Sequence, residues 1–263
     1  MRLGVGSVRR QALRKPTRGG ATLSQMTTVP VLRLDPDLGA GIDSSKRETA
    51  ERTCRARVFE AEAGAWDAKE AVKGQDRTGF GLLVLSGTLC RRVTQGTLRG
   101  AELLGPGDLL RPWDRVGEWS SIPAEADWVV IDNARLAILD ADFSRLAAPF
   151  PEIAVALTRR SLLRSRYLAI LVAIVNQRTI ETRLNMLFWH LADRFGYVRG
   201  EWVDIPVPLT HGLLSELVAA RRPSVSTALS RLRDRGVLVR GDEGWALRGT
   251  APAGFEVLRD GAG

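Results

Sequence analysis

Short apolar runs alternate with turn residues between Arg57 and Asp140. The runs include FGLLVLSG, TLCRRV, AELLGPGD, DWVVID and RLAILD, separated by Gly87, Gly96, Gly100, the Gly-Pro-Gly at 105–107 and Asp132–Asn133. Short strands at regular spacing with such turns are typical of an all-β sandwich or barrel. We therefore predict a β-domain within residues 44–148, preceded by a short helix that Ser44 or Ser45 caps.

The pattern becomes helical from Pro151 to about Arg178 and shows two neighbouring stripes. Two stripes on one helix indicate two packing partners. At ~1.5 Å per residue the helix is about 40 Å long, and such a helix is suited to dimerisation. We predict that one stripe forms a homodimer interface, the alternative being a helix buried within one monomer; this stripe consists of Leu157, Ser161, Arg164, Leu168, Leu171 and Val175.

Further helical spacing follows from Thr179 to about Phe195, where Gly196 is expected as the C-cap. We expect His190, which lies among apolar neighbours, to be a packed side chain rather than a ligand. Residues 202–207 then have the pattern of a strand that ends at Pro206 and Pro208.

Two short helices with a tight break between them follow, which is the pattern of a helix-turn-helix. Thr210 is suited to cap the first helix, and Pro223 is suited to the first turn of the second helix, which ends at Gly236. The N-terminal end of such a second helix enters the major groove of DNA. Two strands around 241–244 would form the wing. The predicted DNA-contacting residues are Thr210, Arg221, Arg222, Pro223, Ser224, Ser226, Thr227, Arg231 and Arg240.

The formal net charge of +8 supports DNA binding only weakly, because residues 1–25 hold six basic residues and no acid. We expect residues 1–43 to be a disordered basic tail. Residues 1–25 could also be an arm that contacts phosphates, or sequence that precedes a start at Met26. The local charge is more informative, since the segment 209–240 carries six arginines against Glu216 and Asp234.

Composition argues against several other classes of protein. Two cysteines and two histidines, dispersed along the chain, do not form a disulfide framework or a cluster with metal-ligand spacing. The longest apolar run, LAILVAIV at 168–175, is far shorter than the ~20 residues that span a bilayer. We predict a cytoplasmic protein with no membrane association, no metal, no cofactor and no catalytic residues.

The segment LTHGLLSELVAARRPSVSTALSRLRDRGVLV at 209–239, together with the order of elements before it, resembles the cyclic-AMP receptor protein / fumarate-nitrate regulator (Crp/Fnr) superfamily. The resemblance covers about residues 57–248. It implies an α+β fold with an N-terminal double-stranded β-helix (jelly-roll, cyclic-nucleotide-binding-like) domain. It also implies a dimerisation helix at 149–178, a winged helix-turn-helix at 179–250 and a C-terminal tail at 251–263.

Two residues of the helix-turn-helix depart from the family pattern. Ala219 occupies the turn position where the family usually has glycine, and a left-handed alanine costs ~1 kcal/mol. Pro223 stands where many members have a glutamate that reads a base. We therefore expect an altered base preference, with Arg222 as the base reader that carries over.

The β-domain departs further from members that bind cyclic nucleotide. Gly107–Asp108 matches their Gly-Asp turn, but their Gly-Glu pair falls on Arg111–Pro112, and Glu125 stands where their phosphate-binding arginine belongs. A carboxylate repels a phosphate, so we predict that cyclic AMP is not the effector. Gly107, Asp108, Arg111 and Trp113 form a candidate pocket for another ligand, anionic or aromatic. The alternative is a salt-bridged arginine and a core tryptophan.

The sequence thus predicts a transcription regulator that binds double-stranded DNA as a homodimer on a pseudo-palindromic operator. RNA polymerase is a further candidate partner. Three other readings remain open at this point: the same regulator gated by a different small ligand, a β-barrel enzyme, and a winged helix that has become a protein-binding module.

Overall fold

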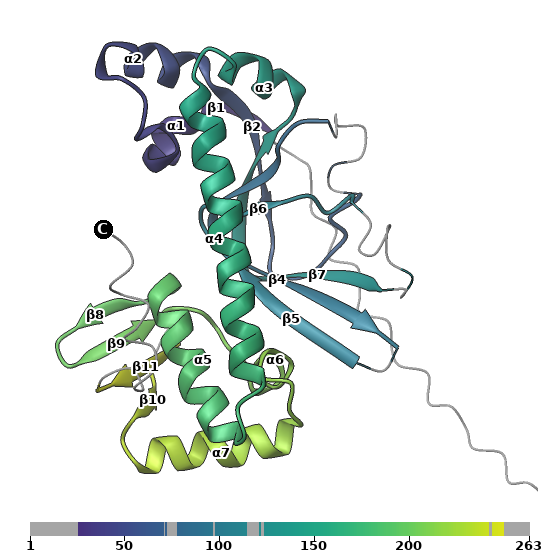
Figure 1. The fold of residues 1–263 in the computed structure, drawn as a ribbon, viewed down its shortest axis with the longest axis vertical. Helices are drawn as coiled ribbons and strands as arrows, with labels where there is room; N and C mark the ends of the chain where they lie inside the picture. Colours follow the sequence, from purple (N-terminus) through teal and green to yellow (C-terminus); the bar gives the residue numbers. More distant parts are fainter. Residues whose placement is uncertain are drawn as a thin grey trace, which may run out of the picture.

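The computed structural model describes residues 26–70, 72, 78–96, 98–114, 121, 124–241 and 244–249. It has the predicted α+β architecture, with an antiparallel β-domain, a long helix and a C-terminal helical domain that contains a small sheet (Figure 1). Within these residues no helix is both long and apolar enough to cross a membrane.

One antiparallel sheet builds the β-domain. Its main path runs β1-β2-β7-β4-β5, with β3 paired to β7 and β6 paired to β4. The strands are β1 (Thr27–Pro30), β2 (Arg55–Ala61), β3 (Gly64–Trp66), β4 (Gly81–Gln95), β5 (Leu98–Leu104), β6 (Leu109–Leu110) and β7 (Glu125–Leu139).

Two long strands, β4 and β7, form the centre of this sheet. Each spans 15 residues and continues through a point where the sequence suggested a turn, at Gly87 in β4 and at Asp132–Asn133 in β7. The register shifts there, between Val84 and Leu89, as expected for bulges that bend a sheet. Gly87 has φ +82°, and a Cβ at this position would lie 2.3 Å from the Asn133 carbonyl oxygen. Glycine is therefore required for the bend.

The N-terminal segment corrects the expectation of disorder over residues 1–43. Residues 1–25 lie outside the described part, but β1 pairs with β2, and α1 (Val31–Leu34) and a 3-10 helix, η1 (Pro36–Gly39), follow it. Val31 and Leu38 are buried, because this short apolar segment packs into a core with β2 and α4. The side chain of Asp43, rather than Ser44 or Ser45, caps α2 (Ser44–Thr53). The last helix before the long one is α3 (Ala141–Ala147).

The long helix α4 (Pro151–Val175) begins with Pro151 at its first turn and lies along the β-domain. The stripe predicted to form the dimer interface largely faces the helix's own chain. Leu157 is 2% exposed in a core with α1 and α3, and Arg164 pairs with Glu102 on β5. Leu168 and Leu171 line a small cavity against α5, while Ser161 is exposed and Val175 is half-buried. The neighbouring stripe is buried against the chain as well, at Ile153 and Ile174. The periodicity therefore located the inward side of the helix, and the residues that contact a partner stay a prediction.

The outward side of α4 carries a different stripe. Val155, Leu162 and Val172 are 67%, 59% and 59% exposed, and Ala169 between them is exposed as well. Spacings of seven, seven and three residues place these side chains on one face, the a/d pattern of a two-helix seam. We call these residues the outward stripe; in the single chain it is available to a partner.

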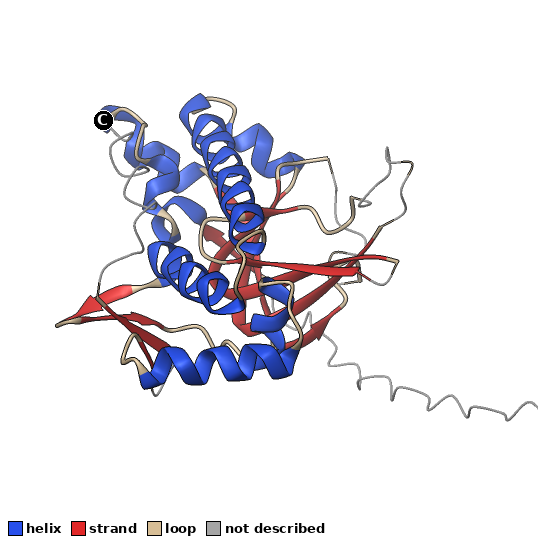
Figure 2. Ribbon diagram, turned by 60° about the horizontal axis from the view of Figure 1, so that its bottom comes forward, coloured by secondary structure: helices blue, strands red, loops and turns tan. Residues whose placement is uncertain are grey.

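The C-terminal domain combines three helices with a four-stranded sheet of order β10-β11-β9-β8 (Figure 2). Gly196 caps the first helix as predicted, through its N–H to the Ala192 carbonyl. The elements are α5 (Ile180–Phe195), β8 (Tyr197–Arg199), β9 (Trp202–Ile205), α6 (His211–Leu217), α7 (Arg222–Asp234), β10 (Leu238–Arg240) and β11 (Trp245–Arg248).

Candidate nucleic-acid interface

Helices α6 and α7 form the predicted helix-turn-helix. The Thr210 side chain caps α6 by accepting the Leu213 N–H at 3.1 Å. Three leucines of α6 and four residues of α7 form the shared apolar core, which fixes the two helices against α5. The buried residues are Leu213, Leu214, Leu217, Val225, Ala228, Leu229 and Leu232.

The turn between the two helices has the strained conformation that the sequence predicted. Ala219 has φ 49° and is the one non-glycine residue with positive φ among the described residues. Arg183 of α5 holds this turn by donating to the carbonyl oxygens of Val218, at 3.2 Å, and Ala219, at 3.4 Å. These two bonds offset part of the ~1 kcal/mol that a left-handed alanine costs.

Helix α7 lies across the outer end of the C-terminal domain, and its first turn is exposed (Figure 1). Pro223 lies in this turn, as predicted, and Arg221, Arg222 and Ser224 are exposed around it. The positive end of the helix dipole and the uncapped N–H groups also point outward here, and both favour an anion such as a phosphate.

This face of the helix-turn-helix carries mainly positive charge. Among the described residues, no carboxylate forms an ion pair with Arg221, Arg222 or Arg231. Glu216 pairs with Arg92 and Glu181 with Arg235, and Asp234 lies at the opposite end of α7 from Arg221 and Arg222. The face is thus a local concentration of unpaired positive charge, whatever the net charge of the whole chain.

Two hydroxyl groups predicted as DNA contacts are already bonded within the protein. Ser226 Oγ lies 2.9 Å from His211 Nδ1 and donates to the Arg222 carbonyl at 3.1 Å. Ser226 is therefore placed to hold α6 against α7 and is only partly exposed. Thr227 donates to the Pro223 carbonyl at 3.2 Å but is exposed, so its oxygen remains accessible.

The wing is the hairpin of β10 and β11, in which Leu238 pairs with Leu247 and Arg240 with Trp245. Its turn, at residues 242–243, lies outside the described part. Arg240 is tied to the body of the domain, because it donates to the Leu209 carbonyl at 3.2 Å and its guanidinium lies 5.0 Å from the Trp245 ring. Its charge is exposed beside the helix-turn-helix but is held in one position.

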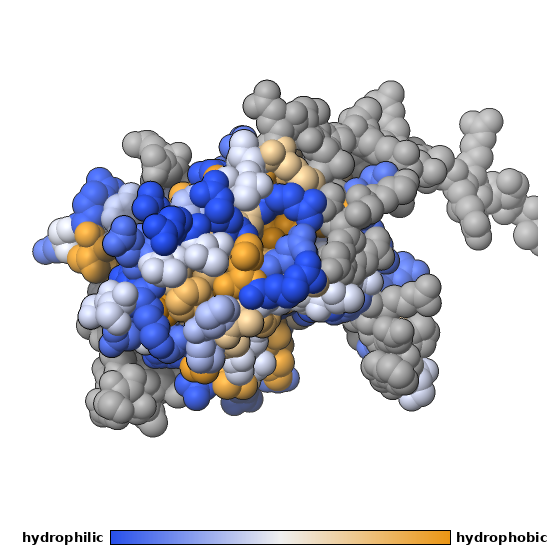
Figure 3. Space-filling model, turned by 90° about the horizontal axis from the view of Figure 1, so that it is seen from above, coloured by the Kyte–Doolittle hydropathy of each residue, from blue (hydrophilic) through white to orange (hydrophobic). Residues whose placement is uncertain are grey.

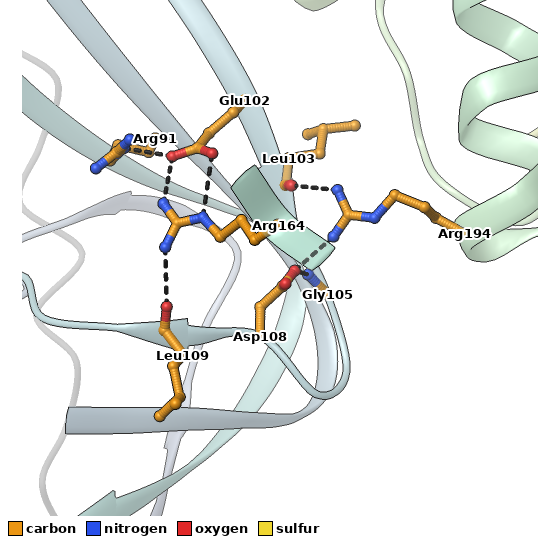
Figure 4. A network of polar contacts seen from close by, with 8 residues as sticks. All are labelled: Arg91, Glu102, Leu103, Gly105, Asp108, Leu109, Arg164 and Arg194. Carbon is orange, nitrogen blue, oxygen red and sulfur yellow. Dashed lines mark hydrogen bonds and ion pairs between the residues drawn. The ribbon is translucent and has the colours of Figure 1, made fainter. Parts of the chain in front are cut away.

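The four residues predicted to form a ligand pocket do not come together. Asp108 is buried, accepts the Gly105 N–H at 2.8 Å and pairs with Arg194 of α5 at 2.5 Å (Figure 4). Gly107 forms the turn beside it, with φ +89°. Arg111 donates to Asp114 at 2.7 Å and to the Gly79 carbonyl at 2.5 Å, and stacks over Trp113, which packs into the β-domain core. The structure instead matches the alternative, in which Arg111 forms a salt bridge and Trp113 packs against the core.

A hollow of about 770 Å³ nevertheless lies between the β-domain and α4. Its lining is mixed in charge, and Glu125 is part of it, as the sequence alignment with the phosphate-binding arginine implied. The lining includes Lys69, Arg91, Arg111, Glu125, Asp127 and Arg164. The two arginines at its inner side, Arg91 and Arg164, both pair with the buried carboxylate of Glu102 (Figure 4). One internal carboxylate thus partly neutralises these two guanidinium groups, and Glu125 and Asp127 add negative charge to the lining.

The side chains of His190, Cys54 and Cys90 are buried in the interior of the protein. His190 is buried against Tyr167, with ring centroids 5.6 Å apart, and burial lowers its pKa to about 4. Burial raises the pKa of Cys54 to about 11 and that of Cys90 to about 12. In the part of the chain that the structure describes, no group of three or more His, Cys, Asp or Glu side chains could hold a metal ion.

Comparison with known protein families identifies the C-terminal segment. Residues 182–248 match the Crp-like helix-turn-helix domain, which includes most of α5, both helices of the motif and the wing. No curated protein matches the chain in sequence.

Solved structures share the fold over most of the chain at low identity. A cyclic nucleotide-binding domain containing protein from Listeria monocytogenes EGD-e has a TM-score of 0.60 and 14% identity, covering 82% of this chain and 97% of its own. A CooA variant from Carboxydothermus hydrogenoformans has a TM-score of 0.56 and 15% identity, covering 74% and 84%. FixK2 from Bradyrhizobium japonicum has a TM-score of 0.53 and 14% identity, covering 74% and 93%.

The Crp/Fnr resemblance stated from the sequence is therefore confirmed in two respects. The chain carries a Crp-like helix-turn-helix domain, and its antiparallel β-domain, long helix and C-terminal domain share the fold of these structures.

Proposed function

We propose that the protein is a transcription regulator that binds DNA sequence-specifically as a homodimer, on a pseudo-palindromic operator, and that cyclic AMP does not control it. The observation that carries the proposal is the exposed first turn of α7, where Arg221 and Arg222 have no carboxylate partner within the part of the chain that the structure describes. An exposed arginine at this end of a recognition helix is placed to contact a guanine edge in the major groove.

The homodimer is supported by the outward stripe of α4. Val155, Leu162 and Val172 leave apolar surface in water at a heptad-like spacing. Seen from the end at which α4 begins, the surface has hydrophobic residues dispersed among hydrophilic ones (Figure 3). A second copy packed on this stripe would bury these side chains and place two recognition helices in one two-fold particle. A two-fold protein predicts a two-fold operator, with half-sites about one helical turn apart.

Control by cyclic AMP is disfavoured by the charges of the hollow. Glu125 contributes a negative charge to its lining, while Arg91 and Arg164 are engaged by Glu102. A regulator gated by a different small ligand is the second candidate, because the hollow of about 770 Å³ is large enough for one. RNA polymerase is the downstream partner that a transcription regulator would recruit or exclude.

The direct test uses DNA selected in vitro from a random library by the full-length protein. We expect Arg222→Ala to weaken binding to the selected site by ~1–3 kcal/mol and to relax specificity at one position of each half-site. Arg233→Ala removes the same charge from the last turn of the same helix and serves as the matched control. Equal binding by wild type and Arg222→Ala would refute the assignment of the base-reading residue, and failure to select any site would refute the proposed function.

A further inference from the structure

The C-terminal domain packs on the β-domain of its own chain through a continuous interface, which we call the domain seam. On the β-domain side the seam consists of Cys90, Leu103 and Gly105, and on the other side it includes Leu191 and Leu217 from α5 and α6. Cys90 and Leu103 are buried in the same apolar core as the helix-turn-helix. The two domains are therefore not separate bodies joined by a linker alone.

Arg194 fastens α5 to the β-domain at the centre of the seam. Its guanidinium donates to the Leu103 carbonyl at 2.9 Å and to Asp108 at 2.5 Å (Figure 4). The same guanidinium lies 4.6 Å from the Tyr167 ring of α4. The Arg194 and Asp108 side chains are only 11% and 10% exposed. The pair fixes the geometry of the contact, and removing either partner alone would leave an unpaired buried charge in the seam.

A second ion pair joins the domains at the helix-turn-helix itself. Arg92 of β4 donates to Glu216 of α6 at 2.6 Å, and both side chains are about three-quarters buried. This contact fixes the orientation of α6, and through the shared core that of α7, relative to the sheet.

Gly105 permits the close approach on which the seam depends. A Cβ at this position would lie 2.3 Å from Cε1 of Phe195, the last residue of α5. The φ of Gly105 is not in the left-handed region, so the requirement for glycine here is steric and comes from the opposite domain.

Strand β5 is the common anchor for the helix that carries the outward stripe and for the DNA-binding domain. Glu102 of β5 holds Arg164 of α4, and the carbonyl of the next residue, Leu103, holds Arg194 of α5. Arg164 is further fixed by donating to the Leu109 carbonyl at 2.9 Å. Two adjacent residues thus tie α4 and α5 to the same strand, and α5 packs against the recognition helix in the shared core.

We propose that the domain seam is a positioning device: the close approach at Gly105, the Asp108–Arg194 pair and the Arg92–Glu216 pair fix the DNA-binding domain on its own β-domain, so that the two recognition helices of a dimer are held at operator spacing. The inference rests on the proposed function. It adds that residues far from the DNA face determine binding to the whole palindrome.

The physical consequence is a difference between full and half operators. With fixed domains, binding of one recognition helix places the second at its half-site, at a high effective concentration. With freed domains, the second contact must also order a mobile domain, so affinity for the full operator falls. Binding to a single half-site needs only one recognition helix and does not depend on the seam.

The test compares Gly105→Val with Gly100→Val in the full-length protein. Gly100 lies on β5, the strand that ends just before Gly105, and a Cβ there would meet nothing within 4 Å, so it is the matched control. Gly105→Val is preferred to alanine, because rotation of the Phe195 ring could absorb a single methyl group. A third variant, Gly105→Val with Phe195→Ala, removes the clashing ring and distinguishes an opened seam from misfolding of the strand.

Two readouts are needed. The first is DNA binding, measured on the selected full operator and on a single half-site. The second is amide hydrogen exchange of α6, which is measured without DNA. For Gly105→Val we expect faster exchange in α6 and about tenfold or greater loss on the full operator, with half-site affinity unchanged. We expect Gly100→Val to behave as wild type and the double variant to recover.

Wild-type binding of the full operator by Gly105→Val would overturn the proposal, as would unchanged exchange in α6 or an equal loss on the half-site. Absence of DNA binding by the wild-type protein would refute the proposed function itself. In that case the exchange measurement would still decide whether the seam fastens the two domains.

Discussion

Truncating the outward stripe of α4 should dissociate the dimer, and Leu162→Ala is the sharpest such change. Leu162 is 59% exposed in the single chain, and burying a leucine fully stabilises by ~1.5–3 kcal/mol. A dimer that covers the exposed part therefore gains about 1–2 kcal/mol from each copy of this side chain. Since a two-fold interface contains the residue twice, the loss is about 2–4 kcal/mol, or roughly 30- to 700-fold in the dissociation constant.

Sedimentation equilibrium over a range of protein concentrations measures this constant directly. The matched control is Leu146→Ala, which truncates a 39% exposed leucine on α3, away from the stripe. Equal dissociation constants for the Leu162 and Leu146 variants would refute the assignment of the interface to the outward stripe.

The remaining predictions concern the turn, the buried histidine and the hollow. Ala219→Gly removes the cost of a left-handed alanine, so the free energy of unfolding should rise by up to ~1 kcal/mol in denaturant titration; a decrease would contradict the strain argument. His190 has a folded pKa of about 4, below its ordinary value of 6.5, so the unfolded chain binds more protons between these values. Its contribution to stability is present above pH 6.5 and is lost as the pH falls toward 4, by up to ~3 kcal/mol. His190→Gln should flatten that dependence, and an unchanged slope would exclude His190 as its source. Calorimetry with cyclic AMP should detect no micromolar binding, and clear binding would show that Glu125 does not exclude the cyclic phosphate.

The helix-turn-helix was the most predictable part, because its signals are local. Thr210 is a good N-cap, Pro223 fits a first turn, and Ala219 falls at a position that the motif makes left-handed. Each of these follows from the chemistry of one residue in a known register.

The sequence was less informative where a choice depended on distant residues. Both stripes predicted on α4 pack against the chain itself, through contacts such as Arg164 with Glu102, 62 residues apart, and the exposed stripe of Val155, Leu162 and Val172 lies on a third face. The cap of α2 shows the same limit locally, because Asp43, Ser44 and Ser45 are all good N-cap residues.

The β-domain shows why turn residues can mislead. Gly87 and Asp132–Asn133 suggested strand ends, but bulges carry β4 and β7 through both points. The residues of the predicted pocket lie apart for a related reason. Asp108 and Arg111 are close in sequence, but the short strand β6 lies between them, and Asp108 contacts Arg194 of α5 whereas Arg111 contacts Asp114.

Genome-wide mapping of the DNA bound by the protein tests the central claim most directly. The account predicts recovery of a two-fold symmetric motif with half-sites about one helical turn apart, and loss of that motif for Arg222→Ala but not for Arg233→Ala. Recovery of no common motif, or of the same motif with both variants, would contradict it.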